Sequence, residues 1–96
     1  MKFIQVIEYQ TSRFEEINAL VEKHRANSDA GSGPIRGTVG LDRDRPNTYV
    51  SLIEFESYEK AMENSNKPET TELAKQMAEL CDAPPKFYNL DVVVEG

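Results

Sequence analysis

Apolar and polar residues alternate along four segments of the chain, which is the pattern of β-strands. These segments cover residues 2–9, 35–42, 48–55 and 87–94. Two longer segments instead repeat apolar residues every three or four positions, which is the period of an amphipathic helix. They cover about 13–27, and the stretch from Ser57, a favourable N-cap, to the Pro84–Pro85 pair. The predicted order is therefore strand, helix, strand, strand, helix, strand.

The second helix contains a proline in its middle. Pro68 has no backbone N–H and disfavours helical angles at the residue before it. The helix must therefore end near Asn64 and restart with Pro68 in its first turn, where proline is well tolerated. The break either bends the helix around a curved sheet or opens a cleft that freed backbone groups and Asn64 could line.

This order predicts an α+β fold of the ferredoxin-like βαββαβ type, a four-stranded antiparallel sheet with two helices on one face. Ninety-six residues are enough for one domain, spanning 1–96. Gly37 and Gly40 in the second strand predict a bulge or a close backbone approach. The single cysteine, Cys81, falls on the apolar helix stripe and is interpreted as a buried packing thiol.

Neither face of the predicted sheet is polar enough to meet water. One set of alternate strand positions is wholly aliphatic: Ile4, Val6, Val50, Leu52, Leu90, Val92 and Val94. The other set mixes apolar residues with short polar ones: Phe3, Gln5, Ile7, Tyr9, Tyr49, Ser51, Ile53, Phe55, Phe87, Asn89, Asp91 and Val93. Two helices cover only one face, so the other needs a partner, and a second copy of the chain is the simplest. We therefore expect a homodimer.

The segment from Tyr49 to Met62, YVSLIEFESYEKAM, runs from a strand into a helix. Together with the βαββαβ order and the two apolar sheet faces, it resembles the dimeric α+β barrel superfamily, over nearly the whole chain. That group includes the antibiotic-biosynthesis-monooxygenase-like and the stress-responsive A/B barrel proteins. The resemblance implies a dimeric α+β barrel, in which two sheets face each other with the helices outside.

Charge and composition narrow the possible partners. The net charge of −6 and the scattered basic residues argue against nucleic acid and against anionic membrane surfaces. The first residues lack the apolar run of a signal peptide, and no stretch could span a bilayer, so we expect a cytoplasmic protein. One histidine and one cysteine, far apart, make no metal-ligand cluster. With no nucleotide motif either, we expect no cofactor and no metal.

The candidate chemistry rests on a few polar residues in apolar surroundings. His24 shares the helix stripe of Phe14, Ile17 and Val21, so it is either a satisfied core group or a general base that faces the sheet. Asp91 is a second possible base, or it lies at an edge or dimer contact. We expect the substrate-binding residues to be Gln5, Tyr49, Ser51, Asn64 and Asn89, since a few polar groups in an apolar wall are typical of small-molecule pockets.

Two functions stay open at this point. The first is a small-molecule-binding dimeric barrel without a catalytic motif. The second, which the family resemblance implies, is a cofactor-independent monooxygenase-like enzyme acting on a small aromatic molecule of the quinol or anthrone type. Cofactor-free monooxygenases of the superfamily tend to use a tryptophan and an asparagine, and haem-degrading relatives also use a tryptophan. This chain has no tryptophan, which disfavours haem degradation.

Overall fold

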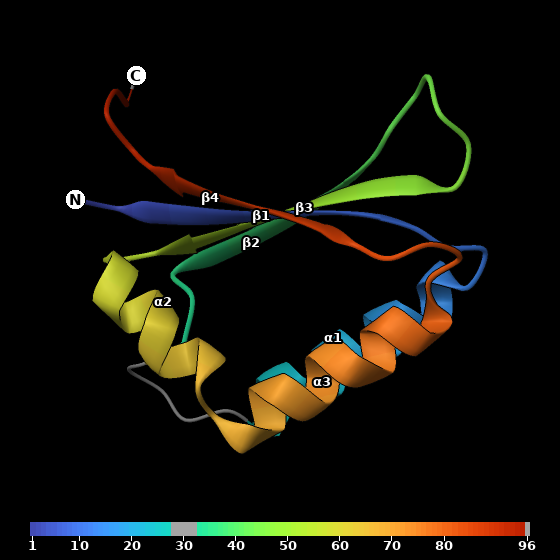
Figure 1. The fold of residues 1–96 in the computed structure, drawn as a ribbon, viewed down its shortest axis with the longest axis horizontal. Helices are drawn as coiled ribbons and strands as arrows, with labels where there is room; N and C mark the ends of the chain where they lie inside the picture. Colours follow the sequence, from blue (N-terminus) through green and yellow to red (C-terminus); the bar gives the residue numbers. More distant parts are fainter. Residues whose placement is uncertain (28–32, 96) are drawn as a thin grey trace.

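The computed structural model describes residues 1–27 and 33–95, which form four strands and three helices (Figure 1). The elements are β1 (Phe3–Gln10), α1 (Phe14–Asn27), β2 (Arg36–Leu41), β3 (Thr48–Phe55), α2 (Tyr58–Ser65), α3 (Pro68–Leu80) and β4 (Lys86–Asp91). The predicted βαββαβ order is confirmed, with the second helix divided into α2 and α3. None of the described helices is long and apolar enough to cross a lipid bilayer.

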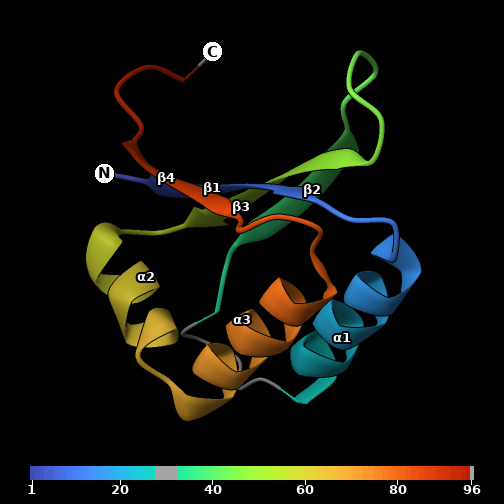
Figure 2. The same cartoon turned by 45° about the vertical axis from the view of Figure 1, so that its right-hand side comes forward.

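The strands form one antiparallel sheet in the order β2-β3-β1-β4, so β2 and β4 are its edges. All three helices lie on the same side of this sheet, and the other side carries no helix (Figures 1 and 2). The turn between β2 and β3 and the segment after β4 both extend toward that open side. The described residues therefore form two layers, and they leave one face of the sheet uncovered.

Burial identifies which face the helices cover. Phe3 and Phe55, paired across β1 and β3, are each 2% exposed and form a buried cluster with Ala61 of α2. Tyr9 at the other end of β1 is also buried. Because side chains alternate between the two faces of a strand, the mixed set of positions faces the helices and the aliphatic set faces outward.

The interruption of the second helix is confirmed. Ser57 caps α2 by accepting a hydrogen bond from the Lys60 N–H at 3.2 Å, and α2 ends at Ser65. The Lys67 N–H then donates to the Asn64 carbonyl at 3.3 Å, and Pro68 opens α3 at its first position. Proline is tolerated there because the N–H it lacks would have no helical acceptor. Figure 1 shows that α2 and α3 form a wide V, so the break redirects the chain rather than bending one helix gently.

A buried threonine ties the far end of the helical layer to the sheet. Thr11, just after β1, accepts a hydrogen bond from the Arg13 N–H at 2.9 Å and donates one to the Leu80 carbonyl at 2.7 Å. Its own N–H donates to the carbonyl of Asn47 at 2.9 Å. The hydroxyl thus joins the start of α1 to the end of α3, which fixes the position of both helices against one end of the sheet.

Three details differ from the sequence predictions. The pairing of β2 with β3 runs without a bulge, and nothing lies within 4 Å of a Cβ built on Gly37 or Gly40, so no close approach within the described chain requires these glycines. β4 ends at Asp91 rather than at residue 94, and one further backbone hydrogen bond follows it, from the Val92 N–H to the Lys2 carbonyl at 2.9 Å. Cys81 is only partly buried, and this burial raises the pKa of its thiol.

Candidate functional site

On the two central strands, β1 and β3, the helix-facing side of the sheet is buried at its ends and partly accessible in its middle. One end row contains Phe3 and Phe55, and the other contains Tyr9, which is 3% exposed. The two rows between them follow from the strand register: Gly37, Ile53, Gln5 and Asn89 in one, and Val39, Ser51, Ile7 and Phe87 in the other. Every member of these middle rows is half-buried or exposed, although three helices cover this side of the sheet. The helices therefore close the ends of the interlayer space but not its centre.

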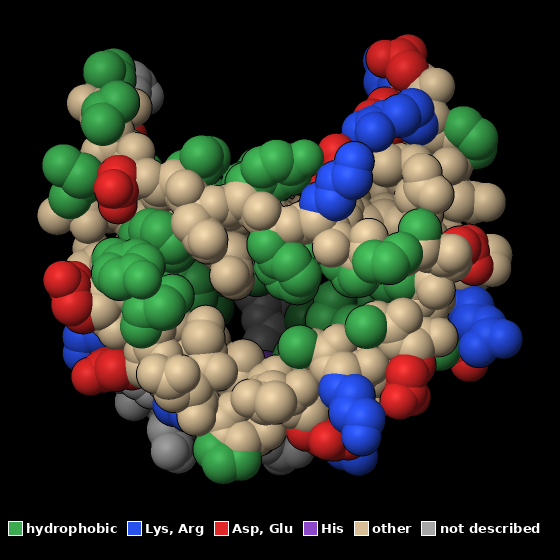
Figure 3. Space-filling model, viewed as in Figure 1, with side chains coloured by type: hydrophobic (Ala, Val, Ile, Leu, Met, Phe, Trp, Pro, Cys, Tyr) green, Lys and Arg blue, Asp and Glu red, His purple; other side chains and the backbone are tan. Residues whose placement is uncertain are grey.

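The space-filling view shows the consequence. A hollow opens between the sheet and α3, with α2 to its left, and hydrophobic side chains surround its opening (Figure 3). We call the space between the middle rows of the sheet and the helices the chamber. Phe87 of the edge strand β4 belongs to these rows and is 54% exposed, which an aromatic ring in a closed core would not be.

The sheet-facing side of α3 is narrow and uncharged. Cys81 follows the last residue of α3 and is half-buried at one end of the sheet, where the Asp82 N–H donates to the Gln10 carbonyl at 2.8 Å. Met77, Ala74 and Thr70 precede Cys81 at intervals of four, three and four residues, which places them on the same stripe. Ala74 is exposed in spite of facing the sheet. Its small methyl group leaves room between α3 and the sheet at the middle of the chamber.

Four of the predicted site residues come together on the chamber wall. Gln5 and Asn89 are direct cross-strand partners, and Ser51 lies in the neighbouring row, opposite Ile7. Directly opposed side chains on one sheet face have Cβ atoms about 5 Å apart. Asp91 follows Asn89 by two positions and therefore points to the same face. The wall thus carries a short polar strip of amide, hydroxyl and carboxylate groups between Ile7, Ile53 and Phe87.

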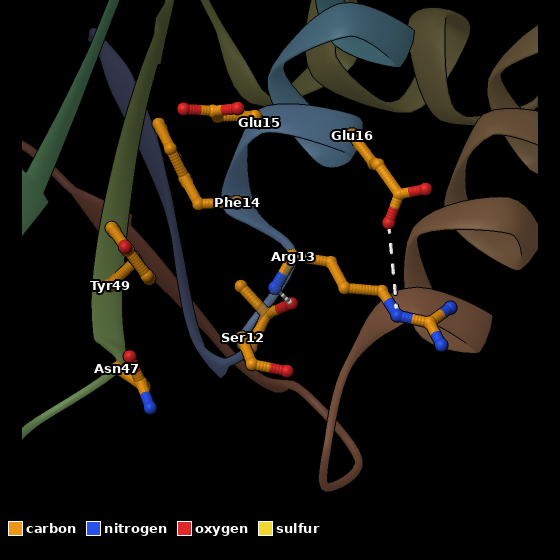
Figure 4. A pocket seen from close by; sticks show the side chains of 8 residues that line it. Ser12, Arg13, Phe14, Glu15, Glu16, Asn47 and Tyr49 are labelled. Atoms are coloured by element: carbon orange, nitrogen blue, oxygen red, sulfur yellow. Dashed lines mark hydrogen bonds and ion pairs between the residues drawn. The ribbon is translucent and has the colours of Figure 1, made fainter.

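Tyr49, the fifth predicted site residue on the sheet, packs between two aromatic rings and does not belong to the polar strip. Its ring stacks on Phe14 of α1 with centroids 4.4 Å apart and lies 5.7 Å from the ring of Tyr9. The Phe14–Tyr49 stack borders a surface pocket of about 430 Å³ at the start of α1, which Asn47 and Arg13 also line (Figure 4). The Arg13 guanidinium extends away from the rings toward Glu16, 3.7 Å distant. Tyr49 therefore closes one end of the chamber.

Tyr9 is unsuited to proton transfer at neutral pH. Burial, with the nearby Cys81 and Tyr49, raises the pKa of its hydroxyl to about 12. The group therefore stays protonated across the physiological range, and it can donate a hydrogen bond but cannot serve as a base.

His24 lies apart from the polar strip. It is half-buried in a groove of about 340 Å³, and the described residues that line this groove all come from α1 and α3: Leu20, Lys23, His24, Glu69, Glu72, Leu73 and Gln76. The apolar stripe of α1 is wide, and His24 lies on the edge of this stripe that is nearer to α3. Within residues 1–27 and 33–95, no three His, Cys, Asp or Glu side chains are arranged to hold a metal ion.

Asn64 lies at the helix break, half-buried, where its carbonyl oxygen accepts the hydrogen bond from Lys67. Its backbone thus serves the helix end, and no described contact joins its side chain to the polar strip. Thr70, which the sequence did not single out, has a buried hydroxyl without a hydrogen-bond partner in the described part of the chain. The sequence signal that could have identified Thr70 is its spacing of seven residues from Met77, which places both residues on the same side of α3.

No protein-family profile and no curated protein sequence matches the chain. Solved structures do. A single-residue variant of SnoaB, a cofactor-independent oxygenase from Streptomyces nogalater, superposes with a TM-score of 0.82 at 15% identity, over 98% of this chain and 95% of that one. A conserved protein from Methanosarcina mazei Go1 superposes with a TM-score of 0.80 at 14% identity, over 94% of this chain and 91% of that one. An antibiotic biosynthesis monooxygenase superposes with a TM-score of 0.74 at 10% identity, over 98% of this chain and 100% of that one.

These similarities extend over almost the full length of both chains in each comparison. The chain has the ferredoxin-like fold of the antibiotic-biosynthesis-monooxygenase-like α+β barrel proteins, as the sequence resemblance predicted. The identities of these three structures to the chain are 10% to 15%, so the likeness concerns the fold.

Proposed function

We propose that the protein binds a small, largely apolar molecule in the chamber between its sheet and its helices. The observation that supports this most directly is the accessible centre of a sheet face that three helices cover. The wall offers aliphatic and aromatic surface from Ile7, Ile53 and Phe87, with Gln5, Ser51 and Asn89 as hydrogen-bonding groups. This combination of apolar surface and a few convergent polar groups is typical of small-molecule pockets.

The surface area of the chain is consistent with this proposal. A compact monomer of 10.9 kDa exposes about 5,600 Å² according to the usual scaling with mass. This chain exposes 6760 Å². An open chamber and an uncovered sheet face would both contribute to the excess.

Replacing Ala74 with phenylalanine is expected to fill the chamber and reduce binding at least tenfold. The Ala74 methyl group faces the sheet where the middle rows are accessible, so a benzyl group there would occupy the ligand's place. The measurement is fluorescence titration with N-phenyl-1-naphthylamine, a neutral probe that becomes bright in apolar surroundings.

Ala19→Phe provides the matched control, because Ala19 is an exposed residue of α1 and receives the same change in size. That variant should bind the probe like the unmodified protein. Equal binding by all three proteins, or no binding by any of them, would contradict the proposed chamber site.

We also propose that a second copy of the chain covers the outer sheet face. Six apolar side chains point outward from β1, β3 and β4: Ile4, Val6, Val50, Leu52, Tyr88 and Leu90. Charged pairs surround them, with Lys2 3.5 Å from Glu54 and Arg45 3.3 Å from Glu8. An apolar centre with a charged rim is the usual anatomy of a protein interface. The β2–β3 turn and the C-terminal segment rise on either side of this face, so a symmetric partner sheet would fit between them (Figure 1).

A second candidate function is cofactor-independent oxygenation of a phenolic aromatic substrate. The observation that favours it is the fold likeness to SnoaB. Asp91 on the chamber side would be the base that accepts the phenolic proton, with Asn89 and Gln5 orienting the substrate. His24 is the other candidate base, but its groove between α1 and α3 makes it the weaker choice.

Oxygen consumption tests this second function. The protein is mixed with 1,8-dihydroxy-9-anthrone and uptake is followed with an oxygen electrode, against the Ala74→Phe variant as the blocked control. Uptake above the spontaneous rate that the blocked variant lacks would support oxygenation. Equal rates in both proteins would leave binding as the function of the chamber.

A further inference from the structure

Asp91 is the one charged residue among the described strand positions that face the helices. The other positions of this face are aliphatic, aromatic, glycine or short and neutral. The sheet-facing stripe of α3 carries no charged residue either, since it consists of Thr70, Ala74 and Met77. Among the described strand positions and along this stripe of α3, Asp91 is therefore the one charged side chain.

This carboxylate has no counter-ion in the described part of the chain. Lys2, the nearest basic residue in the strand register, alternates with Phe3 and so points to the outer face. There it forms ion pairs with Glu54 at 3.5 Å and Glu95 at 3.0 Å. No hydrogen bond or ion pair joins the Asp91 carboxylate to residues 1–24 or 33–95. The charge is left available for a group that enters from outside.

The surroundings of Asp91 suit a cation. Its cross-strand partner is Phe3, whose ring meets that of Tyr58 edge to face, with centroids 5.3 Å apart. Tyr58 begins α2 and is 51% exposed, so part of its ring surface is open to a ligand. The Phe3 ring thus lies between Asp91 and Tyr58. An ammonium group would be attracted to the carboxylate by charge and to the accessible ring through its electrons.

We propose that the ligand of the chamber carries a protonated amine, which Asp91 binds at the end of the polar strip. This inference rests on the proposed binding function and adds the chemical class of the ligand. An aromatic or alicyclic body would lie against Ile7, Ile53 and Phe87. Asn89 is two residues from Asp91, so the amine would lie about 7 Å along the strand from the groups that meet Gln5 and Asn89.

Three naphthalene derivatives of nearly equal size test the charge preference. They are 2-naphthylmethylamine, which is cationic at pH 7, the neutral 2-naphthalenemethanol, and the anionic 2-naphthoate. Each displaces N-phenyl-1-naphthylamine from the protein in a competition titration. We expect the amine to bind about fivefold tighter than the alcohol, the scale of a solvent-exposed ion pair, and the carboxylate to bind most weakly. The preference should shrink between 50 mM and 500 mM salt, because added ions screen an exposed charge.

The Asp91→Asn variant should bind the amine and the alcohol with equal affinity. Asp44→Asn is the control, because it removes the same charge from the exposed β2–β3 turn and should keep the preference. Equal affinity for amine and alcohol in the unmodified protein would overturn the amine proposal and leave the binding function intact. That comparison needs no variant, so it holds even if Asp91→Asn folds poorly. Failure of all three compounds and of the probe to bind would instead refute the chamber as a binding site.

Discussion

Replacing Leu52 with lysine is expected to convert the protein from a dimer to a monomer in solution. Leu52 pairs with Val6 across the two central strands, so it lies at the middle of the outer sheet face, and it is 44% exposed. In a symmetric dimer each substitution occurs twice at the interface, and each buries a charge without a partner. We expect a loss of about 4 kcal/mol of association free energy, which is about a thousandfold in the dissociation constant.

Sedimentation velocity across a range of protein concentrations measures this effect. Thr71→Lys on α3 is the matched control, because it adds the same charge at an exposed helix position. That variant should remain dimeric, and both variants should keep the far-ultraviolet circular dichroism of the unmodified protein. An unmodified chain that sediments as a monomer at every concentration would refute the dimer proposal. A Leu52→Lys variant that stays dimeric would place the interface on another surface.

Replacing Phe3 with alanine is expected to destabilise the fold by about 3 to 5 kcal/mol. The Phe3 ring is 2% exposed and contacts both Phe55, at a centroid distance of 6.5 Å, and Tyr58. Its removal leaves a cavity in the buried cluster that attaches α2 to the sheet. Small domains are stable by only about 5 to 15 kcal/mol, so much of the stability would be lost. Urea denaturation at a fixed protein concentration measures the change.

The Phe87→Ala variant is the control for Phe3→Ala, because the same side chain is removed from an exposed position instead of a buried one. Phe87 points to the same face of the same sheet, but it is 54% exposed in the chamber rows. Its truncation should cost less than about 1.5 kcal/mol, since little packing is lost. If Phe87→Ala were as costly as Phe3→Ala, the middle of the sheet would be as tightly covered as its end, and the chamber would not exist as described.

The local features of this chain were predictable because they depend on nearby residues. The alternation of residues 48–55 predicted β3 at its observed bounds, Thr48–Phe55. The chemistry of Pro68 predicted both the end of α2 and the start of α3. The C-terminal strand shows where local pattern is insufficient. Val92–Val94 continue the alternation, yet β4 stops at Asp91, and beyond it Val92 adds one backbone hydrogen bond to Lys2. Val93 and Val94 are accordingly 82% and 86% exposed.

The candidate site was only partly predictable, because its residues come from different elements. Strand parity correctly grouped Gln5, Ser51, Asn89 and Asp91 on one face, since parity is a property of each strand and the register then aligned them. His24 was expected to face these strands. The rotation of α1 places His24 in a groove that α1 and α3 line together, and whether its imidazole also reaches the strands stays a prediction. That rotation is set by packing, which periodicity does not encode.

By itself, the sequence determined the element order, the helix break, the ferredoxin-like fold and the presence of two apolar sheet faces. Each of these follows from the period of side chains along one segment or from the geometry of one residue. Tertiary structure decided which face the helices cover, since Phe3 and Ile4 are equally suited to burial and only the packed helices distinguish them. It also decided that the helices close the ends of the interlayer space and leave its centre open. That result depends on how three helices share one sheet face, a balance of contacts between distant parts of the chain.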